Sequence, residues 1–501
     1  MRLPFTTLAA LATGIAMHPA CAADWLQSGY DAAHRGVNPL EHSLGAANVG
    51  SLVEIANAEF DQKDPVLGTP VYLSAVSTPS GLRDLLFLTT RNGSLLALDA
   101  STLLPIWRKV FPDAGGPIHS SPIVDENRTH VYSYGGDGKV HKYRTGDGEE
   151  SFTNGWPQVV TLKPQWEHVA SALAANGNTS GTRYLYAVTN GYIGDSGDYQ
   201  GHLTTIDLDS GEQTVFNALC SDIATHFIDS GEAGINDCSS RRAGIWGRPG
   251  ATFDSVTGRI YVVTGNGHYD ANFGGYDWGD SVVALPANGR AIDGVPLDSY
   301  TPTSYDMLDL YDEDLGAGSL AIIGAVPGST AGRLAVVEGK DTILRLISLD
   351  DMSGAGGPRN TGGELQATPS AFVCKCSMPQ PAVWTADDGS VWVFAIRGHL
   401  VAYKIVVDGE GIPQLQEQWS AQGVDPYNSG SPVVANGVVF VTYATAMAFD
   451  ARNGQPLWQS DYIGTTRRQG PIVVNGRLYV TSEANLRVFA PDLIFENGLE
   501  E

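Results

Sequence analysis

The chain has 501 residues, of which 43% are hydrophobic, so it can bury a large core. With 59 glycines and only 17% charged residues, the composition favours an all-β repeat array over a string of α/β domains. The formal net charge of −25 disfavours nucleic acid and anionic membrane surfaces as partners.

The first 22 residues have the organisation of a secretory signal peptide. Arg2 forms a short basic region, an apolar run continues to Ala16, and Ala20-Cys21-Ala22 is a small-residue cleavage site. Lipidation of Cys21 is the alternative. No later apolar stretch reaches the ~18 residues that a membrane helix needs, so no membrane span is predicted. We therefore expect residues 23–501 to form a mature protein that is periplasmic or secreted.

An aspartate and a tryptophan recur at the same separation in two distant segments. The segments are "LDASTLLPIW" at 98–107 and "FDARNGQPLW" at 449–458. The aspartate and the Gly or Asn residues suit a turn into an outer strand. We expect Trp107 and Trp458 to pack between neighbouring repeat units rather than to act in catalysis.

Between these segments and beyond them, apolar runs meet at short turns. "SPVVANGVVFVT" (431–442) and "GPIVVNGRLYVT" (470–481) place Asn-Gly between two such runs, and "SPIVDENRTHVYSY" (121–134) has a longer turn. Asn-Gly between apolar runs is the strongest short hairpin signal because both turn positions need positive φ. About eight such units, spaced by roughly 40 residues or more, predict a single eight-bladed β-propeller of four-stranded antiparallel blades.

The last unit lacks one strand. The segment at 24–55 is predicted to supply this strand and to close the ring, which removes exposed sheet edges. More specifically, we expect Trp25–Asn38 to lie against the strand around Leu486–Phe489.

The cysteines of an exported protein are expected to form disulfides. A bridge between Cys220 and Cys238 would close one loop, and structural disulfides are also the expectation for Cys374 and Cys376. The chain contains no Cys-x-x-Cys-His motif, so it encodes no covalently attached haem.

These repeats and the opening segment resemble the quinoprotein propellers, over essentially the whole mature chain. That family contains alcohol dehydrogenases that bind pyrroloquinoline quinone, and it has non-catalytic relatives. Because the same blade occurs in an outer-membrane assembly scaffold without a cofactor, the repeat alone does not assign a function. The functional evidence therefore comes from the insertions between residues 185 and 345.

The first informative insertion is "GIWGRPGATFDSVTGRIYVVTGNGHYD" at 244–270. The resemblance implies that Trp246 lies flat beneath the quinone and that Asn266 binds the metal ion. A planar quinone favours an aromatic floor, and an amide oxygen is a suitable ligand for a hard cation. The alternative is structural: Trp246 packs between blades and Asn266 caps a turn.

The second is "LYDEDLGAGS" at 310–319, where three consecutive carboxylates precede a glycine turn. On an extended segment Asp312 and Asp314 would face the same way. The resemblance implies that this turn supplies the catalytic base and a metal ligand. Asp312 is the base and Asp314 an extra ligand if the segment follows the lanthanide-type pattern, whereas Asp314 is the base if "DLGAGS" follows the polymer-alcohol dehydrogenase pattern. A solvated acidic loop is the alternative.

Two further positions complete the candidate site. Lys340 in "VVEGKDTILRLISLD" (336–350) matches the family's cation beside the quinone carbonyls, where it would stabilise a developing oxyanion. In "GYIGDSGDYQGHL" (191–203), Asp195 or Asp198 stands where the family has an acidic metal ligand.

The sequence also departs from the family pattern. It lacks the adjacent cysteines that cover the cofactor in methanol-type enzymes, and polar residues for the cofactor carboxylates are not evident around 64–72 or 115–123, where His119 is a candidate substitute. These differences concern cofactor binding and leave the fold prediction unchanged.

The resemblance implies a quinoprotein oxidoreductase. Hydride from a small-molecule or polymeric alcohol would pass to pyrroloquinoline quinone bound with Ca²⁺ or a lanthanide ion, and a separate cytochrome or quinone would accept the electrons. A non-catalytic scaffold or binding propeller is the main alternative. A glycan- or polymer-binding propeller is a third hypothesis, based on the aromatic segment "HYDANFGGYDW" at 268–278.

Overall fold

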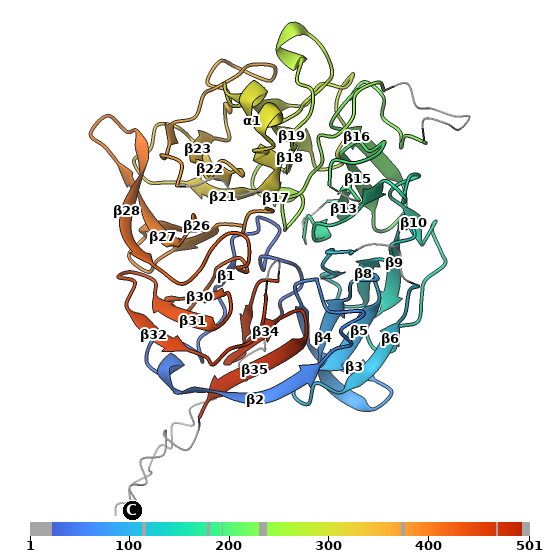
Figure 1. Cartoon of the computed structure of the whole chain (residues 1–501), viewed down its shortest axis with the longest axis vertical. Helices are drawn as coiled ribbons and strands as arrows, with labels where there is room; N and C mark the ends of the chain where they lie inside the picture. The colour runs from blue at the N-terminus through green and yellow to red at the C-terminus, as the bar shows by residue number, and fades with distance from the viewer. Residues whose placement is uncertain are drawn as a thin grey trace, which may run out of the picture.

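The computed structural model describes seven ranges of the chain: 23–112, 117–177, 181–192, 194–229, 238–371, 376–466 and 469–492. Eight antiparallel four-stranded sheets follow one another around a central axis and form a ring (Figure 1). The predicted all-β, eight-bladed propeller is therefore confirmed.

Blades 1 to 8 are numbered in chain order of their innermost strands. Blades 1 to 3 contain β3 (Val71–Thr78), β4 (Gly81–Thr89), β5 (Leu95–Asp99), β6 (Pro105–Lys109); β7 (Ile123–Val124), β8 (His130–Tyr134), β9 (Lys139–Arg144), β10 (Gln158–Val159); and β12 (Ala174–Ala175), β13 (Tyr184–Val188), β15 (His202–Asp207), β16 (Gln213–Asn217). Blades 4 and 5 contain β17 (Thr252–Asp254), β18 (Arg259–Val263), β19 (Val282–Pro286), β20 (Asp298–Tyr300); and β21 (Leu320–Ala325), β22 (Arg333–Glu338), β23 (Leu344–Ser348), β24 (Gln366–Ala367).

Blades 6 to 8 complete the ring. They contain β25 (Ala382–Thr385), β26 (Val391–Ile396), β27 (Leu400–Val407), β28 (Pro413–Ala421); β29 (Val433–Ala435), β30 (Val438–Thr442), β31 (Ala446–Asp450), β32 (Pro456–Gln459); and β33 (Ile472–Val474), β34 (Arg477–Thr481), β35 (Asn485–Pro491) with β2 (Leu52–Glu59). A two-residue strand, β1 (Val37–Asn38), runs parallel to β29. Outside the blades lie the pair β11 (Glu167–His168) and β14 (Asn190–Gly191), helix α1 (Tyr305–Tyr311), and the 3₁₀ turns η1 (Val49–Ser51), η2 (Ala271–Phe273) and η3 (Leu315–Ala317).

The inner hairpins of blades 7 and 8 turn at the predicted Asn-Gly pairs. Asn436 and Gly437 join β29 to β30 with φ of 45° and 75°, and Asn475 and Gly476 join β33 to β34 with φ of 54° and 74°. Left-handed backbone at both positions matches the twist of the flanking strands, which is why Asn and Gly are used there.

The two recurring tryptophans each connect their own blade to the next one. Trp107 on β6 donates its indole N–H to the carbonyl of Thr145 in blade 2 at 2.9 Å, and Trp458 on β32 donates to Leu52 of blade 8 at 2.9 Å. The turn glycine of the next blade makes room for the ring: a Cβ on Gly148 would lie 2.7 Å from Trp107. The Asp…Trp pattern is thus a blade-to-blade packing device, as predicted.

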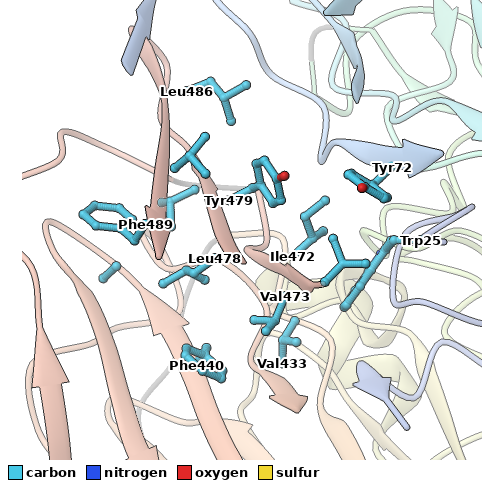
Figure 2. Packing of buried hydrophobic residues seen from close by; sticks show 14 of the residues in the cluster. Trp25, Tyr72, Val433, Phe440, Ile472, Val473, Leu478, Tyr479, Leu486 and Phe489 are labelled. Atoms are coloured by element: carbon cyan, nitrogen blue, oxygen red, sulfur yellow. The ribbon is translucent and has the colours of Figure 1, made fainter. Parts of the chain in front are cut away.

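The ring is closed by a strand from the N-terminal segment, but not by the residues that we expected. Leu52–Glu59 pairs antiparallel with β35, so Ala58 lies opposite Leu486. Trp25 instead exchanges two backbone hydrogen bonds with Tyr72 of β3, and the two rings lie with the side chains of blades 7 and 8 in one apolar cluster (Figure 2). The prediction for Trp25–Asn38 is therefore wrong.

The cause of this error is the position of the missing strand. The outermost strand of blade 8 has most of its side chains exposed, and Val53 and Ile55 are among them. It therefore carries no alternating apolar pattern that marks it in the sequence. Trp25 is almost fully buried and was assigned to the wrong place because large apolar residues are the ones that pattern analysis detects.

The long insertion of blade 3 is tied by a disulfide. Cys220 and Cys238 are bonded, with Cα atoms 5.7 Å apart, as predicted. Cys374 lies outside the described residues.

Among the helices that the structure describes, none combines the length and the apolar character that crossing a membrane requires.

Candidate functional site

Residues from several separate segments meet around one cavity of about 250 Å³. Its walls include Asp195, Trp246, Asp312, Asp314 and Lys340, which the sequence separates by up to 145 positions. This volume lies just below the range of roughly 300–1,000 Å³ that is usual for small-molecule sites. Arg248 lines the central channel together with residues from the inner edges of other blades. Trp246 is only two residues before Arg248, so the site lies beside this channel.

Trp246 is held by its backbone and leaves its indole face to the cavity. Its N–H donates to the carbonyl of Gly316 at 3.0 Å, and its carbonyl accepts the hydroxyl of Ser377 at 3.1 Å. The ring of Tyr199 meets it edge-on, with ring centroids 6.2 Å apart. Within the described chain, the buried indole N–H has no hydrogen-bond partner. Trp246 therefore lines the cavity instead of packing between two blades.

The acidic segment is not extended, contrary to our expectation. Helix α1 ends at Tyr311, and Asp312 follows in the left-handed conformation, with φ of 58°. Asp314 then precedes the 3₁₀ turn η3. The helix cap redirects the chain, yet both carboxylates reach Lys340: its Nζ lies 2.5 Å from Asp312 Oδ1 and 3.2 Å from Asp314 Oδ2.

Two glycines allow this loop to come close to its neighbours. A Cβ on Gly339 would lie 2.8 Å from the carbonyl oxygen of Asp314, and a Cβ on Gly265 would lie 3.3 Å from Asp314 Oδ2. The backbone N–H of Lys340 also donates to the Asp314 carbonyl at 3.0 Å. Glycine is used here because any side chain would push the carboxylate out of position.

Asn266 is joined to the cavity through Asp195, which lines it. Asn266 Nδ2 donates to Asp195 Oδ2 at 2.7 Å, and the hydroxyl of Tyr199 donates to Asp195 Oδ1 at 2.5 Å. The amide oxygen of Asn266 is buried and accepts no hydrogen bond from any described residue. Asn266 therefore presents an unused acceptor next to a carboxylate.

The electrostatics show that negative charge is in excess at this site. Burial and the nearby carboxylates of Asp195 and Asp312 outweigh Lys340 and raise the pKa of Asp314 to about 7. Burial alone would lower the pKa of Lys340, but Asp314 and Asp312 reverse this effect and raise it. Asp314 Oδ1 is buried without a hydrogen-bond donor among the described residues. Such an arrangement is costly unless a cation or a ligand compensates it.

Other sequence candidates lie elsewhere. Asp198 is buried against Arg241, with Oδ1 3.5 Å from its Nε, and does not line the cavity. His119 lines the central channel instead of this cavity. Conversely, Cys376 and Tyr199 were missed as site residues: Cys376 lines the cavity and Tyr199 orients Asp195. No sequence motif marked either residue, although Cys376 stands in the Cys-Lys-Cys run.

The aromatic segment at 268–278 does not form an exposed platform. Tyr269 and Trp278 are buried, and Phe273 alone among its aromatic side chains is largely exposed, at 83%. His268, Asp270 and Asp277 lie close enough to share an ion, but Asp277 already accepts the hydroxyl of Ser240 and the N–H of Cys220. The glycan-binding hypothesis therefore loses its structural basis.

Comparison with known proteins places the chain in a repeat family. The family model PQQ_2, described as outer membrane protein assembly factor BamB, matches residues 61–224 and 383–494, more than half of the chain. The chain belongs to the PQQ_2 family. The matched part of this PQQ_2 protein covers most of the blades, whereas Trp246, Asn266 and the 312–340 region lie in the unmatched middle.

Several of the similar proteins are named as dehydrogenases. The 1-butanol dehydrogenase (cytochrome c) of Thauera butanivorans is 38% identical over 88 residues, which are 17% of this chain and only 12% of that relative. The structure of a quinohemoprotein alcohol dehydrogenase from Pseudomonas putida HK5 matches with a TM-score of 0.64 and 14% identity, over 93% of this chain and 80% of that one. A europium-containing methanol dehydrogenase matches with a TM-score of 0.64 and 14% identity, over 93% and 98%. At this identity the structural matches establish the shared fold.

Proposed function

We propose that this protein is an exported quinoprotein that oxidises an alcohol with pyrroloquinoline quinone held next to a Ca²⁺ or lanthanide ion. One observation supports this proposal above the others. Within the described chain, three buried polar atoms without hydrogen-bond partners belong to the candidate site residues: Trp246 Nε1, Asn266 Oδ1 and Asp314 Oδ1. Each unsatisfied buried group costs stability unless a ligand or an ion pairs with it, and here three of them belong to residues of one candidate site.

The oxygen donors fit a hard cation. Asp314 Oδ1 and Asn266 Oδ1 are buried oxygens free to coordinate, and the exposed Asp195 carboxylate is hydrogen-bonded to the Asn266 side chain. Carboxylate and amide oxygens are the ligands that Ca²⁺ prefers. We assign these three residues to the cation, which would also neutralise the charge that raises the pKa of Asp314.

The remaining residues fit a cofactor and a substrate. Pyrroloquinoline quinone supplies a two-electron acceptor for hydride when it is bound. Trp246 offers an aromatic floor, and the Lys340 ammonium stabilises negative charge that develops at an oxygen near it. Asp312 takes the proton of the substrate hydroxyl, because its side chain is 40% exposed and reachable from solvent, whereas Asp314 is enclosed.

The electron acceptor is a separate cytochrome or quinone, since the chain encodes no haem-attachment motif. The relative from Thauera butanivorans is named as a cytochrome c-linked butanol dehydrogenase, which supports a cytochrome and an alcohol substrate. Both small-molecule and polymeric alcohols stay open as substrates. Export follows from the signal peptide predicted at residues 1–22.

The test combines binding with turnover. The purified mature chain is titrated with Tb³⁺, then mixed with pyrroloquinoline quinone and assayed with alcohols and an artificial electron acceptor. We expect Tb³⁺ binding that Asp314→Ala weakens by more than about 100-fold and that Asp388→Ala, a surface carboxylate in blade 6, leaves unchanged. A native chain that binds neither the ion nor the cofactor contradicts the proposal and favours the scaffold function.

A further inference from the structure

A buried aspartate connects the two loops that carry the proposed cation ligands. Asp280 lies between Gly279 and β19, is only 1% exposed, and adopts a left-handed backbone with φ of 47°. Its backbone N–H donates to the carbonyl of Gly265 at 2.9 Å. Its Oδ1 accepts the backbone N–H of Leu315, also at 2.9 Å. One residue therefore contacts both loops.

Each contacted atom is adjacent to a candidate ligand. Gly265 directly precedes Asn266, and Leu315 directly follows Asp314. The approach is tight: a Cβ on Gly279 would lie 2.1 Å from the carbonyl oxygen of Gly267, on the other side of Asn266. Asp280 thus connects the two loops, with its backbone N–H bonded to the Asn266 loop and its side chain bonded to the Asp314 loop.

Burying the Asp280 carboxyl group at this position costs folding stability. Burial, followed by the nearby charge of Asp314, raises the pKa of Asp280 well above its ordinary value. Its Oδ2 is buried without a hydrogen-bond partner in the described ranges. The left-handed backbone and the unpaired buried oxygen at this one residue both cost stability.

We infer that Asp280 is a positioning residue of the cation site, which holds the Asp314 loop at a fixed distance from Asn266. The inference rests on the proposed function. Asp280 acts through the Leu315 N–H and lies outside the cavity wall. Partners that orient metal ligands from outside the coordination sphere typically change metal affinity 10- to 100-fold when they are removed.

The experiment measures Tb³⁺ affinity of the mature chain, without cofactor, by luminescence excited through the protein tryptophans. Asp280→Ala loses the acceptor for Leu315, and we expect Tb³⁺ binding weaker by about 10- to 100-fold. Asp280→Asn keeps an oxygen at the same place, and we expect affinity within about threefold of the native chain, since the bond to Leu315 is retained.

A matched control separates positioning from loss of stability. Asp298 on β20 is also buried, and its Oδ2 accepts the N–H of Met352 at 3.0 Å, away from the cavity. Asp298→Ala therefore removes the same kind of bond and is expected to lower the unfolding temperature without changing Tb³⁺ affinity. Unfolding temperatures of all variants show that each one is folded during the titration.

The outcomes distinguish this inference from the proposed function. If the native chain binds Tb³⁺ and Asp280→Ala binds equally well, the positioning role is overturned while the cation site stands. If Asp298→Ala weakens binding as much as Asp280→Ala, the effect is general destabilisation and the role is again overturned. If the native chain does not bind Tb³⁺, the proposed function fails and the inference fails with it.

Discussion

Blade 7 and the insertions of blades 3 to 5 use the indole group of a tryptophan in different ways. In the regular blades, the indole N–H of Trp458 is paired with the Leu52 carbonyl, and the hairpins turn at Asn-Gly pairs suited to their backbone. At the site, Trp246 leaves its indole N–H unpaired within the described chain. The same residue type therefore joins blades in one region and lines a cavity in the other.

Carboxylates show the same contrast. On the scaffold, Asp254 is paired with Arg333 at 2.7 Å, and Glu54 with Arg487 at 2.6 Å. At the site, Asp312 and Asp314 share the ammonium of Lys340, the one cationic side chain among the described cavity-lining residues, and Asp195 adds a third carboxylate. Functional sites keep such imbalances because the missing charge is supplied by a ligand. This difference between the regions is therefore a reason to propose a ligand at the cavity, which the shared fold alone does not give.

The largest expected effect concerns the division of roles between the two aspartates. Asp312→Ala should lower turnover by about 10²- to 10⁴-fold, the usual contribution of a general base. Tb³⁺ affinity should stay close to that of the native chain, because Asp314 and Asn266 are intact. Steady-state kinetics and Tb³⁺ titration of the same variant check this. Loss of Tb³⁺ binding in Asp312→Ala would reverse the assignment of the two residues.

On the scaffold, the largest effect is expected from the tryptophan of blade 7. Trp458→Ala removes the bond to Leu52 and the edge-on contact with Phe489, whose ring centroid is 5.1 Å away. We expect a loss of about 2–4 kcal/mol in the free energy of unfolding, somewhat less than for a fully buried tryptophan. Denaturant titration measures it. If Trp458→Ala also weakened Tb³⁺ binding by a comparable free energy, the scaffold and the cation site would not be independent.

Two turn glycines are expected to differ in their sensitivity. Gly437 has φ of 75° and open space around its Cβ position, so Gly437→Ala should cost about 1 kcal/mol for the backbone alone. Gly454 has φ of 71°, and a Cβ there would lie 2.6 Å from the ring of Trp419. Gly454→Ala should therefore cost more, about 2–3 kcal/mol in total. If denaturant titrations gave the same loss in the free energy of unfolding for both variants, the packing of Trp419 would not require a glycine at position 454.

The smallest expected effect depends on pH. Burial opposes protonation of His141, but Asp137 and Glu150 outweigh it and raise its pKa. The protonated ring therefore stabilises the fold below its ordinary pKa, and this contribution disappears as the pH rises through the raised value. His141→Gln should lower the unfolding temperature more at about pH 5.5 than at about pH 9. A pH-independent loss would mean that packing against Tyr143, not charge, is what His141 contributes.

Local patterns in the sequence were sufficient for the parts of the structure that depend on neighbours along the chain. Asn436-Gly437 and Asn475-Gly476 predicted their hairpins because the required backbone conformation is a property of those residues. The Asp…Trp spacing predicted the contacts of Trp107 and Trp458 because each blade repeats the same geometry. The candidate site residues Trp246, Asn266 and Lys340 were proposed from the resemblance to the quinoprotein propellers, and their role stays a prediction.

Only the tertiary structure decided where distant segments meet. The closing strand at Leu52–Glu59 is mostly exposed, so no apolar alternation marked it in the sequence. Whether Asp195 or Asp198 faces the cavity depends on contacts with Asn266 and Arg241, which lie far along the chain. Asp280 carries no motif at all, and its importance comes from two hydrogen bonds made in the folded chain. Turns and repeats can be predicted from the sequence because they depend on residues that are close along the chain. Burial and unpaired charge cannot, because they depend on contacts that form only when the blades assemble.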